Sequence, residues 1–315
     1  MFRFAPLAVL PLAIGCSSAP DGDATPGRDT VVVYEASSLA GPMRAVLDSF
    51  SHRTGAVVSE EHGASLELAR RITELHRVPD VIALADQEVF PELLIPGAMS
   101  WYAAFARNRM VVAYTDRSRH AAEATPASWR SIVLRRDVLL GRTDPVLAPA
   151  GYRTLIVYAL AERFYDEPGL AARLEAKTPP RLLRGNAAEL AALLSAGELD
   201  FIIEYESLAR AQKFRFMQLP PNIDLGEPAH AWEYASASVR VATGHDTVTR
   251  RGAPILYGVG VPRAATHARA GVRFVQFLLG EEGTAILRAA HVDALDHPQL
   301  VGDSVPAALR ARVSP

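Results

Sequence analysis

The 315-residue sequence lacks several features that mark catalytic, metal-binding and nucleic-acid-binding proteins. Its formal net charge of −2 gives no basic excess of the kind that polyanion-binding surfaces need. Its histidines show no metal-ligand spacing, and it has no glycine-rich nucleotide loop or Ser-His-Asp context. These absences argue against a nucleic-acid partner, a resident metal, a cofactor and a catalytic role. They do not argue against one small anion, which a few buried donors can hold without net charge.

Long hydrophobic runs are also missing. The N-terminal apolar run over 4–14 is too short to cross a bilayer as a helix. It follows the positive Arg3 and precedes Gly15, which is typical of a signal peptide. We therefore predict a signal peptide over 1–16 and export to the periplasm or to the outward face of a membrane.

Cysteine is nearly absent. Cys16 is the only one, so the mature chain has none for disulfides or catalysis. One interpretation is that residues 13–16 form a lipobox and that Cys16 is lipid-modified, which would anchor the protein to a membrane. The other is an incidental cysteine in an ordinary signal. The small, polar, Pro/Gly-rich segment 17–29 is typical of a flexible tether.

Strand-like and helix-like patterns alternate along the rest of the chain, which predicts an α/β fold with mainly parallel sheets. The predicted strands cover 31–34, 57–58, 81–84, 110–114, 138–140 and 201–203, and a pair at 236–241 and 255–261. The predicted helices start near 42, 65, 150, 187, 265 and 282. The Pro-rich end from about His297 is expected to be peripheral.

Three strand-to-helix junctions carry small or hydroxyl residues. They are Ser37-Ser38 after the first strand, Ser65 before the second helix, and the segment 144–152, with Pro149 suited to a first helical turn. Helix N-termini offer unpaired N–H groups and a positive dipole end, so such junctions bind anions. The alternative for Ser38 and Ser65 is plain helix capping.

A fourth candidate follows the strand at 201–203. Tyr205 at a strand end can point its hydroxyl into a cleft, or it can pack its ring at the domain surface. Its neighbours Glu204 and Glu206 would ordinarily be solvated charges or salt-bridge partners.

Together these segments resemble the periplasmic molybdate/tungstate-binding proteins, most closely the tungstate-type branch. The similarity runs from about Val31 to Ala290. It includes residues 36–39 (ASSL), 105–115 (FARNRMVVAYT), 141–145 (GRTDP), 151–153 (GYR), 195–200 (SAGELD) and 254–258 (PILYG).

The resemblance implies a periplasmic-binding-protein type II fold: two α/β lobes that close on an anion. The expected lobes are 30–112 with 234–315, and 113–233. The family's ligand positions fall on Ser38, Ser65, Ala150, Ala187 and Tyr205, and less firmly on Ser37, Ala148 and Gly151. The implied partners are a molybdate or tungstate oxyanion and the permease of an ABC importer, and we expect a monomer.

The sequence departs from the tungstate-type branch at two positions. Relatives of that branch carry an Asp and a Glu that can complete a six-coordinate metal centre, where this chain has Ala148 and Ala187. We therefore expect hydroxyls and backbone amides around an intact oxyanion. Asp144 and Glu204 are the alternative carboxylates, although a carboxylate beside a buried dianion is repelled unless it binds the metal directly. The rival functions are binding of sulfate, phosphate or an organic anion, and an enzyme on the same fold.

Overall fold

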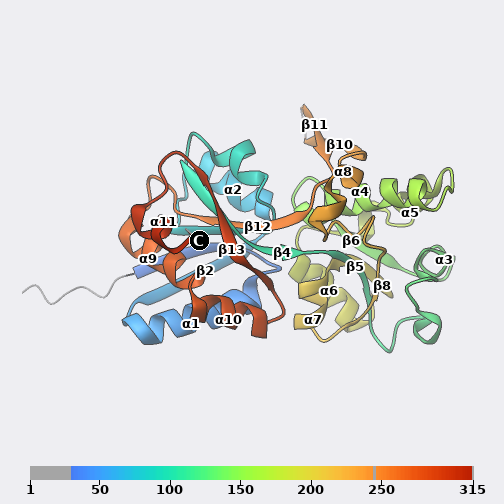
Figure 1. The fold of residues 1–315 in the computed structure, drawn as a ribbon. Coiled ribbons are helices and arrows are strands. Elements are labelled where there is room, and N and C mark those ends of the chain that lie inside the picture. Colours follow the sequence, from blue (N-terminus) through green and yellow to red (C-terminus); the bar gives the residue numbers. More distant parts are fainter. Residues whose placement is uncertain (1–29, 244–245, 314–315) are drawn as a thin grey trace, which may run out of the picture.

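A computed structural model describes residues 30–243 and 246–313. Two α/β lobes lie side by side in it (Figure 1), each built on its own sheet. The predicted signal peptide, the tether and Cys16 lie outside the described residues. Within the part of the chain that is described, no helix is both long and apolar enough to cross a membrane.

The first lobe is built on a six-stranded sheet in the order β13-β4-β12-β3-β1-β2. Its strands are β1 (Thr30–Ala36), β2 (Val57–Gly63), β3 (Val81–Leu84), β4 (Trp101–Asn108), β12 (Ile255–Gly260) and β13 (Asp293–Gly302). Its helices are α1 (Ala40–Thr54), α2 (Ser65–Thr73), α9 (Ala268–Leu278), α10 (Glu281–Ala289) and α11 (Ala307–Val313).

The second lobe is built on a five-stranded sheet in the order β7-β6-β8-β5-β9. Its strands are β5 (Met110–Tyr114), β6 (Leu140–Thr143), β7 (Leu183–Arg184), β8 (Phe201–Tyr205) and β9 (Arg215–Gln218). Its helices are α3 (Trp129–Val133), α4 (Pro149–Phe164), α5 (Leu170–Ala176), α6 (Ala187–Ala196) and α7 (Glu206–Ala211).

Two crossings join the lobes. Arg109 alone separates β4 of the first sheet from β5 of the second. The return from β9 to β12 passes through α8 (Ala231–Tyr234) and a hairpin of β10 (Ser238–Thr243) and β11 (Asp246–Arg251), which projects above the second lobe in Figure 1. The predicted lobe limits of 30–112 with 234–315 and 113–233 stay a prediction; by sheet membership, all of β5 belongs with the second lobe.

Apolar runs in the sequence explain why β3, β5 and α1 lie in the interior of the lobes. All four residues of β3 and all five of β5 are buried, as expected for strands covered on both faces. The buried face of α1 is Pro42, Met43, Val46, Leu47 and Phe50. Gly55 ends this helix in the left-handed conformation (φ 71°), which glycine adopts without the steric cost of a Cβ.

Two sequence predictions about the sheets are wrong. The sheets are mixed rather than mainly parallel: β1 pairs in parallel with β2 and β3, but β12 and β13 pair antiparallel with β4. The strands predicted as a pair at 236–241 and 255–261 do not pair with each other, because β10 pairs with β11 and β12 joins β3 and β4. The segment around His297, which we expected to be peripheral, lies within β13 at the edge of the first sheet.

One strand is shifted relative to its prediction. The strand expected over 138–140 begins at Leu140 and continues to Thr143. Thr143 therefore lies at the end of a buried strand instead of in the connection to α4.

Candidate functional site

A small cavity of about 20 Å³ lies where the two lobes meet. The first lobe contributes the ends of β1 and β2, the start of α2, and Ala85 after β3. The second lobe contributes the ends of β6 and β8 and the starts of α4 and α6. The lining residues are Ala36, Ser37, Ser38, Gly63, Ala64, Ser65, Ala85, Thr143, Ala148, Pro149, Ala150, Asn186, Ala187, Glu204 and Tyr205.

Three helices begin at this cavity. Their first residues are Ser65, Pro149 and Ala187. Each helix N-terminus is equivalent to about half a positive charge, so three N-termini supply about one and a half positive charges toward the two negative charges of a dianion. No lysine, arginine or histidine is among the described residues that line the cavity. The site therefore offers positive potential through backbone dipoles and neutral donors.

The first-lobe wall holds its serines in place through bonds within the protein. The Ser65 hydroxyl accepts the N–H of Ala85 at 3.1 Å, which leaves its own proton free to donate. The Ser38 hydroxyl is one of the hydrogen-bonding neighbours of the buried Tyr257 hydroxyl. The N–H of Ser37 already donates to the carbonyl of Gly63 at 2.9 Å. Ser38 and Ser65 are thus better placed to act as donors to a ligand than Ser37.

Neither serine caps a helix. The N-cap of α1 is Leu39 and that of α2 is Ala64, and neither cap makes a side-chain hydrogen bond. The alternative of plain helix capping is therefore wrong for both serines. Both are buried at the cavity without that structural reason.

The start of α4 leaves one amide for a ligand. Ala148 donates its N–H to the carbonyl of Asp144 at 2.9 Å, and Gly151 donates to Ala148 at 3.0 Å. Pro149 has no N–H. Among the described residues the N–H of Ala150 has no recorded backbone or side-chain partner, as expected in a first helical turn. Ala150 is therefore the donor that this segment offers.

Two predicted positions on this segment lie outside the cavity lining. Asp144 uses a carboxylate oxygen to accept the N–H of Val146 at 2.8 Å. A Cβ on Gly151 would lie 2.5 Å from the Asp144 carbonyl carbon, so the missing side chain permits close packing of backbone on backbone. Both residues shape the loop and neither faces the cavity.

The start of α6 and the end of β8 complete the second-lobe wall. The side chain of Asn186 caps α6 by accepting the N–H of Glu189 at 3.0 Å. Tyr205 is buried with its hydroxyl 3.4 Å from the carbonyl oxygen of Ala85, across the lobe boundary. Its ring packs edge-on against Tyr257, with centroids 5.9 Å apart. Tyr205 therefore packs inside the molecule, and the surface alternative is wrong.

Glu204 is fully buried, contrary to the solvated or ion-paired side chain that we expected. Burial raises its pKa to about 8, while the N–H of Tyr205, 3.0 Å from Oε1, lowers it. Glu206 does form ion pairs, with Arg109 at 3.4 Å and with Arg210 at 2.5 Å. Sequence reasoning missed Thr143 as a cavity residue because the end of its strand was placed too early. It also missed Asn186, the N-cap residue directly before the predicted helix start at 187.

Contacts across the lobe boundary show a closed arrangement. Arg153 of α4 forms an ion pair with Asp86, which follows β3, with Nη2 and Oδ1 2.8 Å apart. Both side chains are about 98 % buried, with relative exposures of 2 % and 1 %. The Tyr152 hydroxyl also donates to Asp86, and the N–H of Leu66 donates to the Leu147 carbonyl at 3.3 Å. The cavity is thus enclosed by the contact of the two lobes.

A cluster on β1 and β2 lies close to the cavity on the first lobe. Ligand atoms of Glu35, Glu60 and His62 lie within 4.8 Å of one another. Burial and the neighbouring Glu60 raise the pKa of Glu35 to about 9. A proton on Glu35 therefore allows the two carboxyl groups of Glu35 and Glu60 to share a hydrogen bond. Glu60 also forms an ion pair with the exposed Arg44.

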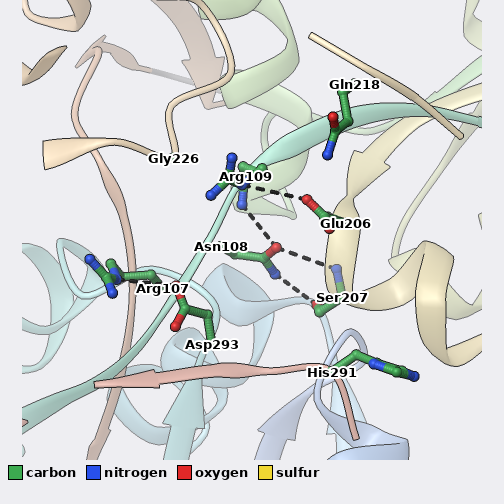
Figure 2. Close-up of a pocket in the computed structure, with 9 residues that line it drawn as sticks. All are labelled: Arg107, Asn108, Arg109, Glu206, Ser207, Gln218, Gly226, His291 and Asp293. Atoms are coloured by element: carbon green, nitrogen blue, oxygen red, sulfur yellow. Dashed lines mark hydrogen bonds and ion pairs between the residues drawn. The ribbon is translucent and has the colours of Figure 1, made fainter. Parts of the chain in front are cut away.

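A larger pocket of about 240 Å³ lies at the crossing of β4 into β5 (Figure 2). The Asn108 amide donates to the Ser207 hydroxyl at 2.7 Å and also to the Tyr257 hydroxyl. The cations Arg107 and Arg109 pair with Asp293 and Glu206, at 3.2 and 3.4 Å. Paired cations beside two carboxylates make this pocket a poor dianion site, and the smaller cavity is the better candidate.

Comparisons with known proteins agree with this architecture. The family model described as bacterial extracellular solute-binding protein matches residues 31–292. A molybdate/tungstate-binding protein of Thermococcus kodakarensis is 31% identical over 338 residues, which cover 97% of this chain and 95% of that protein.

Two solved structures share the fold at low sequence identity. The periplasmic molybdate-binding protein of Azotobacter vinelandii has a TM-score of 0.61 at 15% identity, covering 83% of this chain and 98% of that one. The sulfate-binding protein SubI of Mycobacterium tuberculosis has a TM-score of 0.62 at 14% identity, covering 85% and 88%. The fold is therefore shared by binders of different oxyanions and does not by itself select the ligand.

Proposed function

Because the chain belongs to the family of bacterial extracellular solute-binding proteins, which are non-enzymatic components of ABC transport, we propose that its solute is a tetrahedral oxyanion, molybdate or tungstate. The anion lies in the cavity between the lobes and is delivered to the permease of an importer. Ser38 and Ser65 hold it from the first lobe, and Ala150, Ala187 and Tyr205 from the second.

The observation that carries this proposal is the cavity itself. Pockets for organic ligands usually enclose about 300–1,000 Å³. A cavity of about 20 Å³ lined by hydroxyls and helix N-termini suits a single small anion instead. The Thermococcus relative, named for molybdate and tungstate and similar along nearly the whole chain, supports these two anions over sulfate.

The strength of binding is consistent with neutral donors alone. Nanomolar affinity needs about 12 kcal/mol. Hydrogen bonds to a charged acceptor contribute about 1.5–3 kcal/mol each, so five to seven of them reach that range after the cost of closure. Closure around the bridging anion is a hinge motion at the two crossings.

The coordination of the bound metal follows from two alanines. Ala148 and Ala187, where the tungstate-type branch carries carboxylates, both line the cavity here. Neither alanine side chain carries an oxygen that could bind the metal, so the proposed ligand is an intact four-coordinate oxyanion. X-ray absorption at the molybdenum or tungsten edge tests this point: four oxygen neighbours are expected, and six would contradict it.

Calorimetric titration with molybdate, tungstate, sulfate and phosphate tests the proposal as a whole. We expect saturation by molybdate or tungstate at one anion per chain, with weaker binding of the other two. No binding of molybdate or tungstate, together with saturation by sulfate or phosphate, would show instead that the protein binds one of these other oxyanions. Attachment to a membrane through Cys16 and a monomeric state stay predictions.

A further inference from the structure

Two buried polar atoms of the second-lobe wall have no partner in the described protein. They are Oγ1 of Thr143 and Oε2 of Glu204. Both side chains are completely buried, and both residues line the anion cavity. Buried polar atoms are hydrogen-bonded in nearly all native proteins, so each unpaired one calls for an explanation. A ligand in the cavity would supply the missing partner for both.

The strand register places these two residues side by side. β6 and β8 run parallel with Leu140 opposite Phe201 and Gly141 opposite Ile202. Continued along the strands, this register sets Thr143 opposite Glu204, on the same face of the sheet. A Cβ on Gly141 would meet Leu190 of α6, so that face is the one that α6 covers. The two oxygens therefore lie beneath the N-terminal end of α6, where Ala187 has only a methyl group.

The surroundings of Glu204 favour its neutral form. Burial is the main cause that raises its pKa to about 8, and the Tyr205 N–H is the opposing one. The hydroxyls of Tyr205 and Tyr257 interact electrostatically with Glu204, and burial raises their pKa values above the usual value of tyrosine. Beyond Tyr205, Arg153 is neutralised by Asp86.

Charged groups on the adjoining elements are paired or lie on the other face of the sheet. Arg142 of β6 donates from Nη1 to the Thr143 carbonyl at 3.3 Å, while its Nε has no partner within the described residues; as the neighbour of Thr143 on the strand, it lies on the face opposite to Glu204. Glu189 of α6 accepts from Asn186 at 2.8 Å, and Glu206 of α7 pairs with Arg109 and Arg210. A protonated Glu204 therefore presents an O–H donor, not a charge, to the cavity.

We propose that Thr143 and protonated Glu204 are two further donors to the oxyanion, so that capture of the dianion is linked to one proton held on Glu204. This inference rests on the proposed function. A dianion beside an ionised Glu204 would be repelled, and the Oε2–H bond would be lost. Affinity is then constant at neutral pH and falls by up to about tenfold for each pH unit above the pKa of the free protein.

Titration of the full-length protein with molybdate between about pH 6.5 and 9.5 tests the linkage, with proton uptake obtained from buffers of different ionisation enthalpy. For the wild type we expect affinity at about pH 9.5 to be at least about tenfold below that at pH 7, with proton uptake on binding at the higher pH. Uniform affinity without proton uptake would overturn the inference. Absence of binding of both molybdate and tungstate even at about pH 6.5 would instead reject the proposed function.

Variants assign the proton to its residue. Glu204→Gln keeps a donor without a titrating group, so its affinity should not change with pH. Glu35→Gln is the matched control, because Glu35 also titrates near this range but does not line the cavity; it should keep the wild-type profile. The reverse pattern would transfer the linkage to Glu35 and overturn the assignment. The proton uptake of the wild type tests the linkage even if the Gln variant fails to fold.

Thr143→Val separates the second donor from the first. This substitution preserves shape and removes the hydroxyl, and we expect about a tenfold loss of affinity at every pH with an unchanged pH profile. An affinity equal to that of the wild type would remove Thr143 from the site.

Discussion

The two walls of the cavity are built differently. On the first lobe, the hydroxyls of Ser38 and Ser65 already have protein partners, Tyr257 and the N–H of Ala85. On the second lobe, Oγ1 of Thr143 and Oε2 of Glu204 have none within the described residues. In the binding model that we propose, the first wall is positioned by the protein alone and sets the geometry of the site. The second wall is completed by the anion, which makes binding depend on closure and on pH.

The largest predicted effect comes from removing the preformed wall. Ser38→Ala combined with Ser65→Ala deletes two donors to a charged acceptor, each contributing about 1.5–3 kcal/mol. We expect molybdate affinity to fall at least about 100-fold in calorimetry. Ser131→Ala, at an exposed serine of α3, is the matched control and should bind normally. Unchanged affinity in the double variant would remove the serines from the site.

The next effect concerns closure of the second wall. Asp86→Ala leaves Arg153 buried without its carboxylate in the closed form, and breaking a buried pair costs about 3–5 kcal/mol. Because water can reach Arg153 once the lobes separate, much of that cost should oppose closure. We expect affinity to fall about 10- to 100-fold, and small-angle scattering should show a larger radius of gyration at a given molybdate concentration. Wild-type affinity would show that the pair does not support closure.

The buried acids Glu204 and Glu35 should both affect stability, although only Glu204 is proposed to affect anion binding. Burial raises the folded-state pKa of Glu204 to about 8 and, with Glu60, that of Glu35 to about 9. For an acid with a raised folded-state pKa, stability is fully present below the unfolded value of 4.5 and is lost as the pH rises through the folded value. Glu204→Gln and Glu35→Gln should therefore both raise the melting temperature at pH 8 by a few degrees, an effect on the order of 1–3 kcal/mol.

Thermal melts from about pH 4 to 9 measure the gain in melting temperature of each Gln variant over the wild type. The gain should vanish near the acid end, where both carboxyls are protonated in the folded and unfolded states. A gain that does not depend on pH would mean that neither burial nor charge is its cause.

The smallest effect tests how the first wall is held. Tyr257→Phe removes the hydroxyl that neighbours Ser38, while the Asn108 amide keeps its bond to Ser207. Ser38 then gains rotational freedom, and we expect a loss of affinity of about two- to fivefold, within the range of one neutral hydrogen bond. A loss as large as that of the double serine variant would mean that Tyr257 itself contacts the anion.

Much of the first wall could be predicted from the sequence because its signals are local. The buried run before Ser37-Ser38 and the small residues before Ser65 mark two strand ends. The parallel pairing of β1 with β2 and β3 then brings their ends to one edge of the sheet, as expected for an α/β fold.

The second wall was harder to predict because its features depend on distant contacts. β8, which carries Glu204 and Tyr205, pairs antiparallel with β5 and parallel with β6, across long sequence separations that no local pattern encodes. The shift of β6 moved Thr143 from a loop to a strand end. The burial of Glu204 is likewise a tertiary effect, since a glutamate at a strand end is ordinarily solvated.

A crystal structure of the protein grown with molybdate would locate the anion itself. We expect one tetrahedral anion between the lobes, within hydrogen-bond distance of Ser38, Ser65, the N–H of Ala150 and Tyr205. An anion bound instead at the pocket beside Arg107 and His291, or a central cavity that contains only water, would contradict this expectation.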